Sequence, residues 1–326
     1  MKKKRPTIGL ALSGGFAKGL AHVGVLKVFE ENDIPIDYIS GTSMGSMIGG
    51  LYCSGLSPEQ IEDIILTTEW HGLFNFTMPK NYLIRKFAIR KLIKRLVKDK
   101  SFSQLKPKLF VSGTRLKDGQ KIVFNSGNLT KAIMASVSLP GILKPEKVNG
   151  TEIVDGGLVD PLPVASLKEK CDKIIAVDIS VTYKEQLLRT SHVTDRSRLV
   201  KELKEDFVRM QLKNLKDFFK HQKFKKIPLL FRTILVKTLE YVFTPAAVLD
   251  LMAGRTPPEI AETILQSYTI VMGRVSDLTL KAYNADIVIQ PTSKYTGWFE
   301  FDKAEEFIKG GEKAAKNQLA AIKKLL

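Results

Sequence analysis

Two stretches of the sequence, TIGLALSGGFAKG at residues 7–19 and IDYISGTSMG at residues 36–45, determine the predicted architecture. Each contains a short apolar run of the length of a buried strand, at residues 7–12 and 36–40, followed by a glycine-rich turn. Helical patterns follow both turns, at residues 20–32 and from residue 44 to about residue 54. A strand, a loop and a helix that occur twice in succession are typical of a parallel α/β sheet.

Further elements of both kinds follow along the chain. Short apolar runs predict strands and longer periodic runs predict helices, with Ser57 and Pro58 marking one helix start. The expected strands cover residues 109–116, 121–125, 152–154, 173–179 and 286–290, and the expected helices residues 58–69, 129–137, 258–283 and 302–326. Residues 183–257 break this alternation, because they are basic, helical in pattern and rich in Phe. We therefore expect a single catalytic domain over residues 1–326, with residues 183–257 as a basic helical insertion.

The composition is that of a globular protein and excludes several classes of function. Of the 326 residues, 44% are hydrophobic and 26% are charged, which is too apolar for a disordered chain. With two cysteines, Cys53 and Cys171, the chain has no disulfide framework and no cysteine-rich zinc site. The four histidines lie far apart in the sequence and show no metal-ligand spacing. A metalloenzyme is therefore not expected.

The positive charge is concentrated in two segments. The formal net charge is +17, and residues 82–100 and 198–237 contribute +7 and +8 of it. A local basic segment is typical of contact with a polyanion, either nucleic acid or an anionic membrane. The sequence has no 18-residue window that is both apolar and uncharged, which argues against a membrane span. The apolar run after the basic residues 1–5 is too short for a signal peptide, so we expect a cytoplasmic protein.

The second stretch contains a G-x-S-x-G pattern, formed by Gly41, Ser43 and Gly45. Between a strand and a helix, this pattern is typical of a nucleophile elbow, a turn so tight that the flanking residues must be small. The turn presents the serine hydroxyl above the edge of the sheet, and the following helix offers backbone N–H groups to negative charge. Ser43 is therefore a candidate nucleophile.

The glycine loop at Gly14 and Gly15 has two interpretations. Its backbone N–H groups suit either an acyl oxyanion or a phosphate. A dinucleotide-binding loop has the pattern G-x-G-x-x-G, but Phe16 occupies the position of the second glycine. We therefore favour an oxyanion hole, because attack by a nearby serine nucleophile would form an oxyanion that needs such donors.

A nucleophilic serine needs a base, and two kinds of residue are candidates. None of the four histidines lies in a supporting motif. Asp155, in the sequence Asp155-Gly156-Gly157 at the end of an expected strand, is the other candidate. Two glycines allow the backbone to fold tightly and bring the carboxylate to Ser43, although the same tripeptide also forms simple turns. Both interpretations stay open on these residues alone.

Taken in order, the glycine loop, the G-x-S-x-G pattern and the Asp-Gly-Gly motif resemble the patatin-like phospholipase family, especially its bacterial cytoplasmic and neuropathy-target-esterase-like branch. Residues 19–26, 135–141 and 155–163 are also similar to sequence blocks of that family. The resemblance covers residues 7–179 and 258–291 and leaves the middle insertion unmatched. The motifs together are far more specific than any one of them.

The resemblance implies a patatin-like three-layer α/β/α fold with a mainly parallel central sheet, and a Ser–Asp dyad without histidine. Mapped onto this sequence, Ser43 is the nucleophile and Asp155 its base. The backbone N–H groups of Gly14, Gly15 and Phe16 form the oxyanion hole. No metal or organic cofactor is implied.

Two residues depart from the family pattern. Phe16 stands where a small residue is usual, which affects the third oxyanion donor and the room for substrate. Asp160 stands where Asn is common, which adds a negative charge a few residues from the base. Lys18 matches a position that is usually basic.

The resemblance also implies a function, a serine acyl hydrolase that acts on phospholipid or lysophospholipid. Residues 82–98 and 213–243, which combine basic and apolar side chains, then become candidate docking surfaces for the anionic inner face of a membrane. Two alternatives are a membrane-binding regulator without useful turnover and a lipid acyltransferase that uses the same acyl-enzyme. Nucleic acid is not an expected partner, since no recognition motif accompanies the charge. The sequence does not indicate an oligomeric state.

Overall fold

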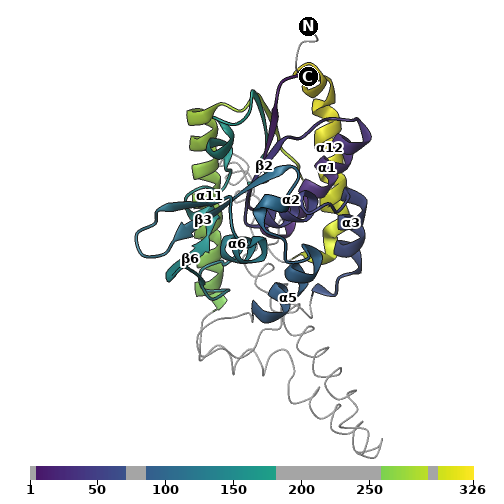
Figure 1. Cartoon of the computed structure of the whole chain (residues 1–326). Helices are drawn as coiled ribbons and strands as arrows, with labels where there is room; N and C mark the ends of the chain where they lie inside the picture. Colours follow the sequence, from purple (N-terminus) through teal and green to yellow (C-terminus); the bar gives the residue numbers. More distant parts are fainter. Residues whose placement is uncertain (1–4, 71–85, 181–257, 293–299) are drawn as a thin grey trace, which may run out of the picture. The chain divides into compact units, whose positions relative to one another are not determined.

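The computed structural model describes residues 5–70, 86–180, 258–292 and 300–326 (Figure 1). The chain divides into two compact units, of which one comprises Met1–Tyr183 with Thr269–Leu326 and the other Lys184–Tyr268. The predicted insertion, residues 183–257, lies outside the described residues and stays a prediction.

The first unit is built on a sheet of eight strands within the described residues, in the order β5-β6-β3-β2-β1-β7-β8, with β4 also beside β3. The strands are β1 (Ile8–Leu12), β2 (Tyr38–Thr42), β3 (Lys108–Arg115), β4 (Lys121–Phe124), β5 (Glu146–Val148), β6 (Thr151–Asp155), β7 (Lys173–Val177) and β8 (Ile287–Ile289). Strands β3, β2, β1, β7 and β8 are parallel, whereas β4, β5 and β6 pair antiparallel. The predicted α/β class with a mainly parallel central sheet is confirmed.

Helices flank the sheet. They are α1 (Ala21–Glu31), α2 (Met44–Cys53), α3 (Pro58–Thr67), α5 (Lys86–Leu96), α6 (Leu129–Ser136), α11 (Pro258–Tyr283) and α12 (Ala304–Lys323). Short 3₁₀ turns are η1 (Phe16–Leu20), η2 (Phe102–Gln104), η3 (Gly156–Leu158), η4 (Val164–Leu167) and η6 (Phe301–Lys303). Figure 1 shows α1, α3 and α12 together on one side of the sheet.

Alternation along β1 explains why the sheet is covered on both faces. Ile8, Leu10 and Leu12 belong to a buried cluster that includes side chains of α1, α2, α3 and α12. Ala11 belongs to a second cluster on the other face, against which Leu280 of α11 packs. Because successive side chains of a strand point to opposite faces, a strand without polar residues must be buried on both.

The second strand lies two residues later than expected. The sequence predicted a strand at residues 36–40, but β2 is Tyr38–Thr42, and Gly41 and Thr42 pair with Val111 and Ser112 of β3. The apolar residue Ile36 belongs to the connection before the strand. The strand therefore leads directly into Ser43, without intervening loop residues.

The register of the sheet brings two distant segments to one place. Thr42 of β2 pairs with Ser112 of β3, and the next residue of β3, Gly113, pairs with Asp155 of β6. Because β6 runs antiparallel to β3, the end of β6 meets β3 beside the end of β2. Ser43 and Asp155 are thus neighbours across the end of the sheet.

Candidate active site

The turn that carries Ser43 is a strained strand-to-helix elbow. Ser43 has φ 52° and ψ −120°, a backbone conformation that residues with a side chain rarely adopt. A Cβ on Gly45 would lie 2.3 Å from the carbonyl oxygen of Leu12, and a Cβ on Gly41 would lie 2.6 Å from that of Gly45. Only glycine fits at these two positions, as the G-x-S-x-G pattern predicted. Strain of this kind costs about 1–3 kcal/mol and is often found at functional sites.

Hydrogen bonds hold the backbone of Ser43 in this conformation. Its N–H donates to Ser136 Oγ at 2.8 Å, and Ser136 Oγ donates in turn to the carbonyl of Ser112 at 2.6 Å. The carbonyl of Ser43 accepts the N–H groups of Ser46 and Met47 at the start of α2. The elbow is therefore anchored on both sides of the serine.

Asp155 lies within hydrogen-bond distance of Ser43. Ser43 Oγ donates to Asp155 Oδ2 at 2.6 Å, although 112 residues separate the two in the sequence. Asp155 Oδ1 accepts the N–H of Gly157 at 2.8 Å, so both carboxylate oxygens are oriented. The two residues are 8% and 1% exposed, so both are buried. Such a geometry allows a carboxylate to take the proton of a serine hydroxyl.

The backbone around Asp155 is tightly packed. Its N–H donates to the carbonyl of Ser138 at 3.0 Å, and Thr114 Oγ1 donates to its carbonyl at 2.8 Å. A Cβ on Gly156 would lie 2.5 Å from the carbonyl oxygen of Ser112. The Asp-Gly-Gly motif is thus a turn packed against β3.

The glycine loop lies against the serine. A Cβ on Gly14 would lie 3.3 Å from Ser43 Cβ. The N–H of Gly14 donates to the carbonyl of Pro161 at 2.9 Å, whereas the N–H of Gly15 has no hydrogen-bond partner within the described part of the chain. Phe16 is half-buried and has φ 55°, the left-handed region that favours glycine. A preference for a small residue at that position thus has a backbone cause.

Asp160, the second departure from the family pattern, follows the Asp-Gly-Gly turn, and its N–H donates to the carbonyl of Gly156 at 2.9 Å. Its Oδ2 accepts Ser112 Oγ at 2.8 Å and lies 3.6 Å from Lys121 Nζ. Burial raises the pKa of this carboxyl above its ordinary value, and Lys121 and Ser112 oppose that effect. The carboxylate does not contact Asp155 through any hydrogen bond within the described residues.

His22, the one histidine among the described residues, is buried and bonds to Ser13, not to Ser43 or Asp155. His22, at the start of α1, is fully buried, and its Nε2–H donates to the carbonyl of Ser13 at 2.8 Å. Burial lowers the pKa of His22 to about 4, so its ring is neutral at pH 7. His71, His192 and His221 lie outside the described residues. No group of His, Cys, Asp or Glu side chains in the described ranges has the geometry to hold a metal ion.

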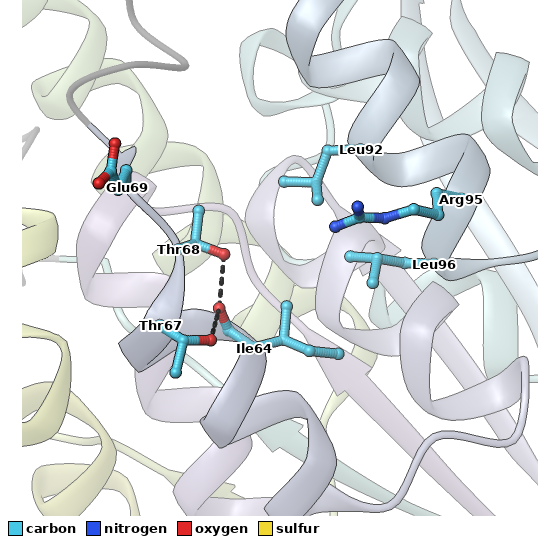
Figure 2. Close-up of a pocket in the computed structure, with 7 residues that line it drawn as sticks. All are labelled: Ile64, Thr67, Thr68, Glu69, Leu92, Arg95 and Leu96. Atoms are coloured by element: carbon cyan, nitrogen blue, oxygen red, sulfur yellow. Dashed lines mark hydrogen bonds between the residues drawn. The ribbon is translucent and has the colours of Figure 1, made fainter.

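A pocket of about 410 Å³ lies between α3 and α5, away from this site. Figure 2 shows its lining side chains, with Arg95 between Leu92 and Leu96 on one side and Thr67 and Thr68 on the other. Neither Ser43 nor Asp155 lines it. The hydroxyl of Thr67 donates to the carbonyl of Asp63 and that of Thr68 to the carbonyl of Ile64, so both are already satisfied.

The basic segment, residues 82–98, is described from Lys86 onward as helix α5 and the turn after it. On one face of α5, the side chain of Ile93 is buried. Val97, just beyond the helix, is also buried. The other side is exposed and basic, with Phe87 at 75% exposure. Its exposed charged residues are Lys91, Lys94, Arg95 and Lys98. Residues 82–85 and the second candidate segment, residues 213–243, lie outside the described residues.

Sequence reasoning did not assign roles to Ser136 and Ser138. Both belong to residues 135–141, which had been singled out only as a block similar to the family. Ser136 supports the N–H of Ser43, and Ser138 supports the N–H of Asp155. A short serine-rich block with no charged residue carries no chemical signal of its own, so only the structure reveals these contacts.

Comparison with known proteins supports the resemblance. Residues 10–168 match the family model described as patatin-like phospholipase. Lysophospholipase NTE1 of Candida glabrata is 35% identical over 179 residues, which are 53% of this chain and 10% of that protein. Lysophospholipase NTE1 of Saccharomyces cerevisiae is 33% identical over 179 residues, 53% of this chain and 11% of that protein. This chain therefore spans about a tenth of the length of these curated relatives.

Two solved structures match this chain more remotely. VipD from Legionella pneumophila is 12% identical, with a TM-score of 0.44 over 98% of this chain and 67% of that chain. Full-length ExoU of Pseudomonas aeruginosa, in complex with SpcU, is 16% identical, with a TM-score of 0.36 over 98% and 69%.

Proposed function

We propose that this chain, which carries a patatin-like phospholipase domain over residues 10–168, is a serine hydrolase of lipid acyl esters. The observation that carries the proposal is the 2.6 Å hydrogen bond from Ser43 Oγ to Asp155 Oδ2 at a strained elbow. The same two residues are those that the sequence motifs indicated.

In the first half of the reaction, Asp155 Oδ2 accepts the hydroxyl proton of Ser43 while Oγ bonds to the acyl carbonyl carbon. The carbonyl electron pair moves to the oxygen and forms a tetrahedral oxyanion. Collapse of this species breaks the bond to the leaving alcohol, which takes the proton from Asp155. The acyl group is then bound to Ser43.

In the second half, Asp155 accepts a proton from water as the water oxygen attacks the acyl carbonyl. Collapse of the second tetrahedral species breaks the bond to Oγ, and Ser43 recovers its proton from Asp155. The products are a fatty acid and an alcohol, and both residues return to their starting state. The reaction as written uses no group beyond the side chains, the backbone and water.

The oxyanion in both halves needs donors that are positioned in advance, each worth about 3 kcal/mol. We assign this contact to the N–H of Gly15 in the loop beside Ser43, and a second donor at Phe16 stays a prediction from the family resemblance. The N–H of Gly14, which the resemblance also implied as a donor, is already bonded to the carbonyl of Pro161. We therefore assign Gly14 to the close approach of the loop to Ser43.

We assign phospholipid or lysophospholipid as the substrate class. The curated relatives are named lysophospholipases, and the matched region of each includes only part of those proteins.

A fluorophosphonate probe, which reacts with activated serines, tests the assignment of Ser43 together with fatty acid release from lysophospholipid micelles. We expect labelling and release with the wild type and neither with Ser43→Ala. Asp155→Asn should lower release at least about 10³-fold, since the amide cannot accept the proton. Ser103→Ala, which removes an exposed hydroxyl on η2, should behave as the wild type. Normal turnover in Asp155→Asn would refute the dyad.

The same experiment separates the alternatives. An unlabelled, folded and inactive wild type would favour a membrane-binding regulator. A lipid acyltransferase would label in the same way but would transfer the acyl group to an added alcohol in preference to water. No observation in the structure favours either over the hydrolase.

For the membrane, we propose docking through the exposed side of α5. Phe87 provides an apolar side chain beside basic residues, and each of these contributes about 1 kcal/mol near an anionic leaflet. None of the helices in the described part of the chain is long and apolar enough to cross a membrane. Docking through residues 213–243, and a location at the inner face of the membrane, stay predictions.

Liposome flotation tests this surface. The variant Lys91→Gln/Lys98→Gln should lose recovery on anionic vesicles by about tenfold and behave as the wild type on neutral vesicles. The control Lys313→Gln/Lys324→Gln removes the same charge from exposed positions on and just after α12. Equal loss in both variants would show that net charge, and not α5, drives binding.

A further inference from the structure

A partly buried ionic cluster connects α5 to strand β5. Lys86 Nζ lies 3.1 Å from Glu146 Oε2, and Arg90 donates to both oxygens of Glu146 at 2.8 and 2.6 Å. The side chains of Lys86 and Glu146 are 13% and 8% exposed. The basic residues of α5 thus fall into two groups, of which Lys86 and Arg90 pair inward and the others face solvent.

The cluster is charged at neutral pH, because its members support one another. Burial pulls the pKa of Glu146 upward, but the hydrogen bonds from Arg90 and Lys86 outweigh it and hold the pKa below its ordinary value. For Lys86, burial lowers the pKa and Glu146 partly restores it. A half-buried lysine destabilises the folded state unless its charge is paired with well-positioned partners.

Lys86 has a second partner that leads to the active site. Its Nζ donates to Ser138 Oγ at 2.8 Å, and the carbonyl of the same Ser138 accepts the N–H of Asp155 at 3.0 Å. The hydroxyl of Ser138 also donates to the carbonyl of Met134 in α6. Two hydrogen bonds therefore separate the ammonium group on α5 from the backbone of Asp155.

We propose that Lys86 is a positioning residue for Asp155, which it fixes through Ser138, so that full turnover depends on the placement of α5. This inference rests on the proposed hydrolase function. The bond from Ser43 to Asp155 is short, and a misplacement of a reacting group by about 1 Å costs up to about 10²-fold in rate. Loss of Lys86 releases one of the bonds that hold Ser138 and lets the Asp155 carboxylate shift relative to Ser43.

Two other roles for Lys86 must be distinguished from positioning. As a membrane-binding charge, Lys86 would affect activity on vesicles but not on a short-chain ester dissolved in water. As a purely structural residue, it would change the melting temperature without a specific change in kcat at a temperature well below melting.

The test compares Lys86→Met with Lys147→Met, both assayed on a water-soluble short-chain ester without lipid. Lys147 is exposed on β5, directly after Glu146 in the sequence, so its replacement removes the same charge from the same region. We expect kcat of Lys86→Met to fall about tenfold with KM within about twofold of the wild type. The control should stay within about twofold of the wild type in both constants. Wild-type kcat in Lys86→Met would overturn the inference.

A double-mutant cycle keeps the test valid if Lys86→Met is unstable. In Lys86→Met, Glu146 keeps both hydrogen bonds from Arg90, so no unpaired carboxylate remains to be accommodated. Ser138→Ala should lower kcat similarly, and Lys86→Met/Ser138→Ala should be no worse than the poorer single variant. Additive losses would refute a path through Ser138. A wild type that fails to hydrolyse the ester would overturn the proposed function itself, which is distinct from an active wild type with an unchanged variant.

Discussion

Ser43 and Asp155 meet at 2.6 Å, but the segments that carry them are held in different ways. The elbow around Ser43 is shaped by close neighbours in the sequence, since Gly41 and Gly45 lie two positions on either side of it. The turn around Asp155 is held by distant residues: Gly113 sets its register, and Ser138 accepts its N–H.

This difference shows how one pair of residues can combine two kinds of constraint. A strained turn is set by steric limits that act over a few residues, so it forms wherever the glycines and the strand permit it. A residue at the end of an antiparallel strand is placed by pairing with another strand, which requires the assembled sheet. Changes near Ser43 should therefore act sharply, and changes around Asp155 should be distributed over several contacts.

The largest effect is expected for Gly45→Ala. Its Cβ would lie 2.3 Å from a backbone oxygen that cannot move without displacing β1, so the free energy of unfolding should fall by at least about 2 kcal/mol. Gly49→Ala, one turn further along α2, is the control, because its Cβ meets only side-chain methyl groups at 3.0 and 3.4 Å. Urea denaturation measures both. Equal stability of the two variants would contradict a sterically defined elbow.

A smaller effect is expected for Ser136→Ala, which tests whether the elbow also depends on a distant residue. The change leaves the N–H of Ser43 without its acceptor, and an unsatisfied buried donor costs about 1–3 kcal/mol. We expect the rate of fluorophosphonate labelling to fall about tenfold. Ser166→Ala is the control, because its buried hydroxyl has no hydrogen-bond partner among the described residues. If both variants label at the wild-type rate, the elbow is held by its local residues alone.

The smallest effect, and one of opposite sign, is expected for Asp160→Asn. Burial raises the pKa of Asp160 in the folded protein, so between the ordinary value of 3.8 and that raised value the folded state binds the proton more tightly than the unfolded state. Stability attributable to this group therefore declines as pH rises through that window. Asparagine has no such charge and still accepts the hydroxyl of Ser112, so the variant should be more stable at pH 7 by about 1 kcal/mol.

Thermal melts of wild type and Asp160→Asn from pH 4 to pH 7 check this sign. The difference between the two proteins should grow with pH. If the wild type is the more stable at pH 7, the ion pair with Lys121, at 3.6 Å, outweighs the burial of the carboxylate.

Much of the fold was predictable because its signals are local. The apolar runs at residues 7–12 and 173–179 predicted β1 and β7, and the helix over residues 258–283 coincides with α11. The strand at residues 36–40 was displaced by two residues, because pairing with β1 and β3 extends it to Thr42 and leaves Ile36 outside. Hydrophobicity marks where a strand is buried, but pairing decides where it begins and ends.

The candidate site divides in the same way. Ser43, Gly41, Gly45 and the Asp-Gly-Gly motif were recognisable, because each chemical role needs a particular residue type in a short pattern. The bond between the N–H of Gly14 and Pro161 was not, nor were the contacts of Ser136 and Lys86. The contacts of Gly14 and Ser136 involve a backbone N–H, which carries no sequence signal, and the partners of Lys86 lie 52 and 60 residues away in the sequence.

By itself, the sequence determined the strand–turn–helix units, the strained elbow and the residue types at the candidate dyad, since these depend on interactions within a few positions. The tertiary structure alone decided that Asp155 reaches Ser43, because the register of β3 with both β2 and β6 sets that distance. It also decided which basic residues of α5 face water and which pair with Glu146. The positions of the charged residues can be read from the sequence. Which of them face solvent is set by what each face of the helix packs against.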